Sequence, residues 1–298
     1  MNITEDYPTD EEAGKGWRLL LGDSCERLAE LDTQSIDLSV FSPPFASLFT
    51  YSPSLRDLGN SKDRPEFLMH FGFIVDELLR LTKPGRICCV HVQQLTSTKA
   101  THGVIGVTDF RGQVISLFTE HDWILHGEVT VDKDPQAQAI RTKAQALMFA
   151  TKNRDSSMTR PALADYLLLF RAPGDNAIQI KTDVTNDEWI QWARPVWLDI
   201  RETNTLNARA GRENADERHI CPLQLDFIER CVRLWSNPGE LVLSPFAGIG
   251  SEGVVAIEQG RRFVGVELKP SYWRTAVDNL QMAERQMGAA TLFDEVLV

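Results

Sequence analysis

Two short turns in this 298-residue chain carry residues whose types and spacing could do chemistry. The first is Ser42-Pro43-Pro44-Phe45, which follows directly on the apolar run 36–41. Prolines fix the backbone φ angle and have no N–H, so they hold a turn rigid and leave backbone carbonyls free to accept hydrogen bonds. The Ser42 hydroxyl can donate or accept, and the Phe45 ring offers a stacking surface.

The chemistry that suits this turn is transfer of a group to the exocyclic amino group of a nucleic-acid base. Such a base must first leave the stack, and it then needs an aromatic face to stack on. Acceptors placed at its N–H hydrogens would leave the nitrogen lone pair directed at an incoming methyl carbon. A structural interpretation is also open, in which the prolines only end a strand and Phe45 lies in the core.

The second turn spans 248–253 and reads G-x-G-x-x-G between a strand pattern and a helix pattern. Its glycines permit a tight turn and let a ligand approach the backbone. An acid, Glu267, ends the next strand, where it could bind a ribose diol. A dinucleotide, S-adenosylmethionine or a structural role all fit this pattern. Because fewer than 50 residues follow Gly253, the rest of the sheet must come earlier in the chain.

The elements that would position these turns alternate between strand and helix patterns, which is typical of an α/β fold. Strands are predicted at 17–21, 36–41, 86–92, 123–131, 165–172, 240–244 and 261–267. Helices are predicted at 24–31, from 65 to about 82, and at 110–121, 225–235, 251–259 and 272–287. Parallel neighbours joined by right-handed crossovers are the default for such a series.

Together the two turns resemble the motifs of S-adenosylmethionine-dependent DNA amino-methyltransferases, which modify N4 of cytosine or N6 of adenine. That family carries [S/D/N]-P-P-[Y/F] as its catalytic tetrapeptide and a cofactor turn like "DPFAGSGT"; this chain has "SPPF" and "SPFAGIGSEG". The catalytic turn precedes the cofactor turn, as in the β class of the family. The resemblance implies a circularly permuted, Rossmann-like α/β methyltransferase fold with inserted DNA-recognition loops.

The resemblance also implies roles for individual residues. In "LLLGDS" the acid Asp23 would contact the cofactor adenine, and "RHICPLQLDFIERCV" (218–232) resembles the helix near its methionine end. No metal is required. The residues implied for catalysis are Ser42, Pro43, Pro44 and Phe45, and those implied for binding S-adenosylmethionine are Asp23, Ser244, Pro245, Phe246, Gly248, Gly250 and Glu267.

Two departures from the family pattern bear on function. Ser244 stands where the family has an acid, and Phe41 precedes the tetrapeptide where cytosine-N4 members often have threonine. Serine at position 42 nevertheless favours cytosine N4, with adenine N6 as the alternative. A DNA-binding relative without activity is a further alternative, which the replacement of the family's acid by Ser244 would favour. Methylation at cytosine C5 would need a cysteine nucleophile after a proline, and this chain has only Cys221-Pro222.

Other classes of enzyme explain the two turns less completely. A nicotinamide dehydrogenase fits the glycine-rich turn but leaves "SPPF" without a role. Methyltransferases of RNA or of protein glutamine use a related turn but usually carry asparagine at position 42.

Charge and composition indicate where DNA would bind. The net charge is −11, yet 133–171 holds seven basic residues and only three acidic ones. We expect residues 1–16 to be a flexible leader, 17–132 and 216–298 the catalytic core, and 133–215 a core strand with target-recognition insertions. Duplex DNA is the predicted partner of a monomer or homodimer. The candidate phosphate contacts are Lys133, Arg141, Lys143, Lys152, Arg154 and Arg160.

Several residues have a structural interpretation beside a functional one. Trp189, Trp192 and Trp197 could contact DNA, but a hydrophobic patch covering the sheet is slightly favoured. His91 ends a predicted strand and could face the pocket or support it from behind. The five cysteines form no CxxC pair, which indicates buried free thiols. No apolar run approaches the ~18 residues that cross a bilayer, so a cytoplasmic enzyme is expected.

Overall fold

The structure is a computed structural model that describes residues 7–44, 58, 61, 64–97, 103, 105–206 and 222–296. Within it, the side chains of Arg141 and of 290–296 are not described. Phe45, a predicted catalytic residue, and 218–221, the start of a predicted cofactor helix, lie outside the described residues, as does Cys221. The described cysteines are free, and Cys88, Cys89 and Cys231 are buried as predicted.

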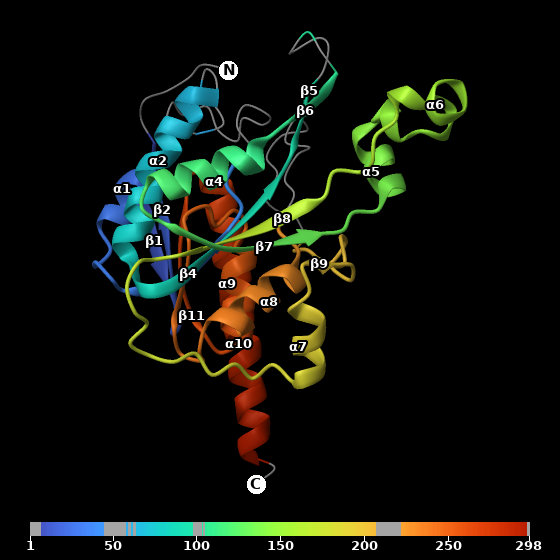
Figure 1. Ribbon diagram of the computed structural model, residues 1–298. Coiled ribbons are helices and arrows are strands. Elements are labelled where there is room, and N and C mark those ends of the chain that lie inside the picture. Colours follow the sequence, from blue (N-terminus) through green and yellow to red (C-terminus); the bar gives the residue numbers. More distant parts are fainter. Residues whose placement is uncertain are drawn as a thin grey trace.

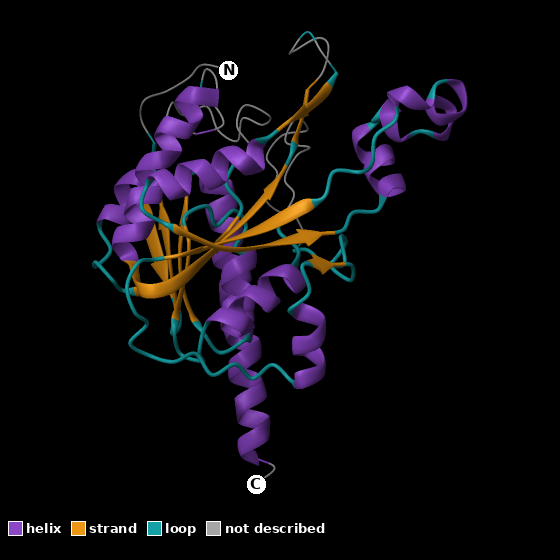
Figure 2. Cartoon of the chain, viewed as in Figure 1, coloured by secondary structure: helices purple, strands orange, loops and turns teal. Residues whose placement is uncertain are grey.

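A nine-stranded sheet forms the centre of the molecule, in the order β1-β2-β11-β10-β3-β4-β8-β7-β9 (Figures 1 and 2). Strands β2, β11, β10, β3 and β4 run parallel, whereas β8 is antiparallel to both β4 and β7. The strands are β1 Asp10–Ala13, β2 Trp17–Leu21, β3 Ile36–Phe41, β4 Thr82–Gln93, β7 Ile124–Val131, β8 Asp165–Arg171, β9 Val196–Trp197, β10 Leu241–Ser244 and β11 Arg262–Glu267. Strands β5 Leu95–Ser97 and β6 Gly106–Thr108 form a separate ribbon.

Helices cover both faces of the sheet, as a central parallel sheet requires. Helices α1, α2 and α4 pack on one face and α8, α9 and α10 on the other (Figure 1). The helices are α1 Ser24–Ala29, α2 Arg64–Leu81, α4 Phe110–Glu120, α5 Pro135–Thr142, α6 Phe149–Arg154, α7 Asn186–Trp192, α8 Leu225–Trp235, α9 Ser251–Glu258 and α10 Pro270–Val296, with short 3-10 helices η2 Gln145–Leu147 and η3 Ser156–Met158. Strand β3 is buried at every position, including its two polar residues, Asp37 and Ser39.

The predicted flexible leader is wrong for part of its length. Residues Asp10–Ala13 form strand β1, which pairs antiparallel with β2 at the edge of the sheet. All four side chains are exposed, so the acidic composition is compatible with an edge strand, where charge discourages pairing with other chains. The ion pair from Glu11 to Arg18 of β2 adds to the pairing.

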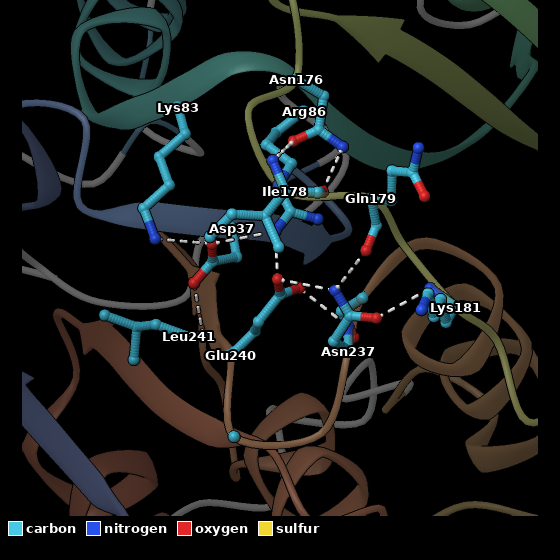
Figure 3. A network of polar contacts seen from close by, with 12 residues as sticks. Asp37, Lys83, Arg86, Asn176, Ile178, Gln179, Lys181, Asn237, Glu240 and Leu241 are labelled. Carbon is cyan, nitrogen blue, oxygen red and sulfur yellow. Dashed lines mark hydrogen bonds and ion pairs between the residues drawn. The ribbon is translucent and has the colours of Figure 1, made fainter.

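A buried polar network ties β3, β4 and β10 together at the edge of the sheet where these strands begin (Figure 3). Asp37 pairs with Lys83 at 2.6 Å and with Arg86 at 3.2 Å, and it accepts the Leu241 N–H at 2.9 Å. Arg86 also pairs with Glu240. These contacts fix the relative register of the two strands that carry the predicted turns.

Between β7 and β8 the chain leaves the sheet to form an insert, residues 135–158, which holds α5, η2, α6 and η3. This 135–158 insert stands away from the core (upper right in Figure 1). No helix among the described residues combines the length and the apolar character needed to cross a bilayer.

Candidate active site

The two predicted turns meet at one edge of the sheet. Strand β3 lies beside β10, in parallel, with Leu38 opposite Val242 and Ser39 opposite Leu243. Ser42 directly follows β3 and Ser244 ends β10, so both turns leave the carboxyl ends of neighbouring strands. Ligands of open α/β sheets bind at this edge.

The glycine-rich turn presents its backbone to open space. Gly248 and Gly250 have φ angles of +54° and +87°, a left-handed conformation that favours glycine. A Cβ built on Gly248 would meet no atom within 4 Å, whereas one on Gly250 would lie 3.2 Å from the Ala276 Cβ. The turn therefore offers a ligand an accessible backbone at Gly248.

The acids predicted to hold the cofactor also organise the loops around this turn. Glu267 accepts the N–H groups of Gly248 and Lys269 through its two carboxylate oxygens, each at 2.8 Å. Asp23 caps α1 by accepting the Cys25 N–H at 2.8 Å. The loops that follow β2 and β10 are bonded to each other, since Ser24 Oγ donates to the Pro245 carbonyl at 2.6 Å.

The remaining predicted residues of this turn differ in their surroundings. Ser244 is fully buried, and among the described residues its Oγ has no hydrogen-bond partner. The Phe246 ring packs against Phe41 at 5.8 Å and Phe71 at 6.2 Å between ring centroids, which anchors the turn to the α2 face of the sheet.

A buried acid lies in the same turn. Glu252 is 4% exposed at the start of α9. Burial raises the pKa of Glu252 to about 8, and the nearby Glu267 adds to the rise. Glu252 is therefore largely uncharged at neutral pH. The sequence pattern did not indicate this, because it shows only that residue 252 lies between two glycines.

Ser42 contacts a histidine that the sequence left between two interpretations. Ser42 Oγ lies 3.1 Å from His91 Nδ1 and 3.3 Å from the His91 carbonyl oxygen. Ser42 and His91 lie side by side because each directly follows one member of a pair across the two strands, Phe41 at the end of β3 and Val90 of β4. His91 thus contacts the predicted catalytic turn directly.

An acid that sequence reasoning missed lies on the other side of His91. Asp165 Oδ2 is 3.1 Å from His91 Nε2 and 2.6 Å from Lys133 Nζ, and Oδ1 accepts from Gln93 at 2.8 Å. Burial alone raises the pKa of Asp165, but His91 and Lys133 outweigh it and hold that pKa below its usual value. The available signal was a charged residue opening an otherwise apolar strand, "DYLLLF".

This ion pair corrects one predicted phosphate contact. The Lys133 side chain is 3% exposed and bound to Asp165, so it cannot reach a DNA backbone. Lys143, Lys152 and Arg154 are exposed on the 135–158 insert, and Arg160, just beyond it, is half-buried. The side chain of Arg141 is outside the described set.

The tryptophans between 189 and 197 serve mainly as packing. Trp197 is buried and its Nε1–H donates to the Trp192 carbonyl at 2.9 Å. The Arg230 guanidinium of α8 lies over both indole rings, 5.2 Å from the centroid of Trp192 and 5.0 Å from that of Trp197. The predicted hydrophobic patch is confirmed for this pair, whereas Trp189 is exposed.

Comparison with known proteins identifies the family. Residues 36–278 match the family model for DNA methylases that carries the N6/N4 methyltransferase name. The chain belongs to the DNA methylase family. Among curated relatives, the type II methyltransferase M.BglI of Bacillus subtilis is 29% identical to this methylase over 118 residues, which are 39% of this chain and 30% of M.BglI.

Two solved structures share the fold of this methylase. TTHA0409 of Thermus thermophilus, in complex with S-adenosyl-L-methionine, superposes with a TM-score of 0.65 at 21% identity, covering 89% of this chain and 94% of that one. The cytosine-N4-specific PvuII DNA methyltransferase gives a TM-score of 0.64 at 18% identity, with 92% and 90% covered. The predicted Rossmann-like methyltransferase fold is confirmed; the circular permutation stays a prediction.

No group of three or more histidine, cysteine, aspartate or glutamate side chains is arranged to hold a metal ion within the described ranges.

Proposed function

We propose that this methylase transfers a methyl group from S-adenosylmethionine to the exocyclic amino group of a base in duplex DNA, with cytosine N4 favoured over adenine N6. The observation that carries the proposal is the meeting of the Ser42-Pro43-Pro44 turn and the open glycine-rich turn at the ends of two adjacent parallel strands. Serine at position 42 is the reason for favouring cytosine N4.

The residues around the glycine-rich turn fit S-adenosylmethionine. The backbone at Gly248 is open, which suits close approach of the methionine portion. Glu267 keeps acceptor capacity for ribose hydroxyls, and Asp23 stands at the adjacent loop, where the adenine would lie. The Ser244 hydroxyl, buried without a partner among the described residues, is available to the methionine end in place of the family's acid. When bound, this cofactor supplies an electrophilic methyl group on a sulfonium sulfur.

The catalytic turn would orient the target amino group. Ser42 Oγ and the Pro43 carbonyl accept hydrogen bonds from the amino hydrogens, which directs the nitrogen lone pair at the methyl carbon. The nitrogen forms the new C–N bond as the C–S bond breaks with its electrons on sulfur, and the surplus proton on nitrogen leaves to water. Most of the acceleration would come from alignment of the two reacting atoms.

A base inside a duplex cannot reach this edge, so the target base would be flipped out. Phe45, which follows Pro44 in the chain, is proposed as its stacking surface. The 135–158 insert is proposed to contact the DNA backbone through Lys143, Lys152 and Arg154.

The test is transfer of a tritium-labelled methyl group from S-adenosylmethionine to duplex DNA of mixed sequence. We expect incorporation by the wild-type protein and a loss of at least about 100-fold in Ser42→Ala, in line with removal of a group that positions the reacting atoms. Incorporation into RNA or protein but not DNA would contradict the proposal. DNA binding without incorporation would instead favour the inactive relative.

A further inference from the structure

Four polar side chains form a continuous row across four neighbouring strands of the sheet. Ser42 follows β3, His91 lies on β4, Asp165 begins β8 and Lys133 follows β7, in the same order as the strands pair. The atoms along this row are separated by 3.1 Å, 3.1 Å and 2.6 Å. The row starts at the catalytic turn and leads away from it.

The row is built into the core. Successive strand residues point to opposite faces, and Val40, Cys89, Leu167 and Val131, each two positions from a member of the row, all lie in the apolar cluster under α8. His91 is 8% exposed, Asp165 4% and Lys133 5%. The Phe227 ring of α8 packs edge-on against the His91 ring, with 5.3 Å between the two ring centroids.

The charges along the row decide which ring nitrogen of His91 carries its proton. Asp165 is ionised and paired with Lys133, and its Oδ2 lies 3.1 Å from His91 Nε2, an ion-pair contact rather than a well-aligned hydrogen bond. In a neutral imidazole one nitrogen donates and the other accepts, so a carboxylate at Nε2 selects the tautomer with the proton there. Nδ1 is then an acceptor for the Ser42 hydroxyl. A second acceptor for that hydroxyl in the described part of the chain is the His91 carbonyl, at 3.3 Å, so both draw the Ser42 proton toward His91.

We propose that His91, held by Asp165 and Lys133, is a positioning residue that turns the Ser42 proton inward, so that Ser42 offers only acceptor lone pairs to the substrate amino group. This role rests on the proposed function, because it matters only if an amino group is the target. It explains how a serine, which could donate or accept, acts as an acceptor in this turn.

A doubly protonated His91 ring would oppose this arrangement. With protons on both ring nitrogens, Nδ1 donates to Ser42 Oγ and occupies a lone pair that Ser42 would otherwise offer to the substrate amino group, while the His91 carbonyl is still an acceptor for the Ser42 proton. The groups that face His91 include Ser42, Asp165 and the Phe227 ring, with Lys133 and Gln93 on the far side of Asp165 and Glu202 4.0 Å from Lys133. The rate of methyl transfer should therefore fall when His91 takes up a proton.

Kinetics test the role with two variants. His91→Phe keeps a ring against Phe227 but offers no side-chain acceptor, whereas His91→Asn has an Oδ1 that can replace Nδ1. We expect the single-turnover rate to fall ~10–1,000-fold in His91→Phe, with the Kd values for S-adenosylmethionine and DNA within about 3-fold of wild type, and to recover in part in His91→Asn. The matched control is His121→Asn, a second histidine–aspartate pair (2.5 Å from Asp76) on the helices of the opposite face.

Nitrogen-15 NMR of labelled histidine tests the hydrogen-bond direction without any turnover. The His91 signal is assigned by its absence in His91→Phe. We expect the Nε2-protonated tautomer at neutral pH, and the Nδ1-protonated one in Asp165→Asn/Lys133→Met, where the amide can donate to Nε2 and no buried charge is left unpaired.

The outcomes separate the two proposals. An Nδ1-protonated ring in the wild type, or a wild-type rate in His91→Phe, overturns the role of His91 while methylation stands. An Nε2-protonated ring in a protein that methylates no DNA overturns the proposed function, and the positioning role falls with it.

Discussion

At the scale of single residues, the site depends on polar groups whose surroundings decide their chemistry. Ser42 and Ser244 are both serines at the ends of adjacent strands, yet Ser42 touches His91 whereas Ser244 has no partner among the described residues. Glu252 and Glu267 are both acids beside the glycine-rich turn. Glu267 accepts hydrogen bonds from two backbone N–H groups, whereas Glu252 is buried. Residue type alone does not distinguish the members of either pair.

Glu252 should make the stability of the protein depend on pH. Its pKa is about 8 in the folded state against an ordinary value of 4.5, so the folded protein keeps a proton that the unfolded chain releases. The free energy of unfolding should therefore fall as pH rises from about 4.5 to about 8 and level off above that range. We expect Glu252→Gln to be close to wild type at pH 5 and about 2–4 kcal/mol more stable at pH 8.5.

Urea unfolding of both proteins at the two pH values measures this difference, in which the titrating groups that do not interact with Glu252 cancel. Equal losses of stability in the two proteins between pH 5 and pH 8.5 would show that Glu252 titrates normally.

At the scale of elements, the third glycine of the turn fixes how α9 packs. A Cβ on Gly253 would lie 2.5 Å from Leu280 of α10 and 2.6 Å from Phe263 of β11, both inside van der Waals contact. We expect Gly253→Ala to destabilise the fold by about 1–3 kcal/mol, since extra volume in a packed core displaces its neighbours.

Denaturant unfolding checks this prediction beside Gly288→Ala, which sits in α10 with no atom within 4 Å of the added Cβ. The control should be neutral or up to about 1 kcal/mol more stable, because alanine favours a helix over glycine. A Gly253→Ala protein as stable as Gly288→Ala would mean that α9 can move aside.

Much of the secondary structure could be predicted from the sequence, for physical reasons. The strand 36–41 is mainly apolar and ends at two prolines, and the strand–turn–helix at 240–259 has apolar segments separated by proline and glycine. The row from Ser42 to Lys133 could not be predicted, because it depends on β8 lying between β4 and β7, and strand order is not written in local periodicity. Strand β1 was missed because its four exposed side chains give no apolar pattern.

At the scale of the whole molecule, the charge distribution is uneven. The chain carries a net charge of −11, whereas Lys143, Lys152 and Arg154 are exposed on the 135–158 insert, away from the core (Figure 1). The same insert exposes Ile140 (81%) and Phe149 (67%). An anionic protein that binds DNA must do so through a local basic surface of this kind.

Neutralising this surface should weaken DNA binding. We expect Lys152→Gln/Arg154→Gln to lower the affinity for duplex DNA and to reduce the slope of log K against log salt by up to about 2, since each phosphate contact contributes ~0.9. Fluorescence anisotropy across a salt series measures both, and binding of S-adenosylmethionine should be unchanged. The double variant Lys181→Gln/Arg285→Gln removes the same charge elsewhere; equal effects from the two doubles would contradict a role for the insert.

The atom that receives the methyl group decides whether the site works on an amino group. The most direct measurement is to incubate the protein and its Ser42→Ala variant with duplex DNA and S-adenosylmethionine bearing a deuterated methyl group, digest the DNA to nucleosides and identify the labelled nucleoside by mass spectrometry. We predict labelled N4-methylcytosine, or N6-methyladenine as the alternative amino product, that is absent with the variant. Label at cytosine C5, or equal label with and without the Ser42 hydroxyl, would contradict an amino-directed site built on this turn.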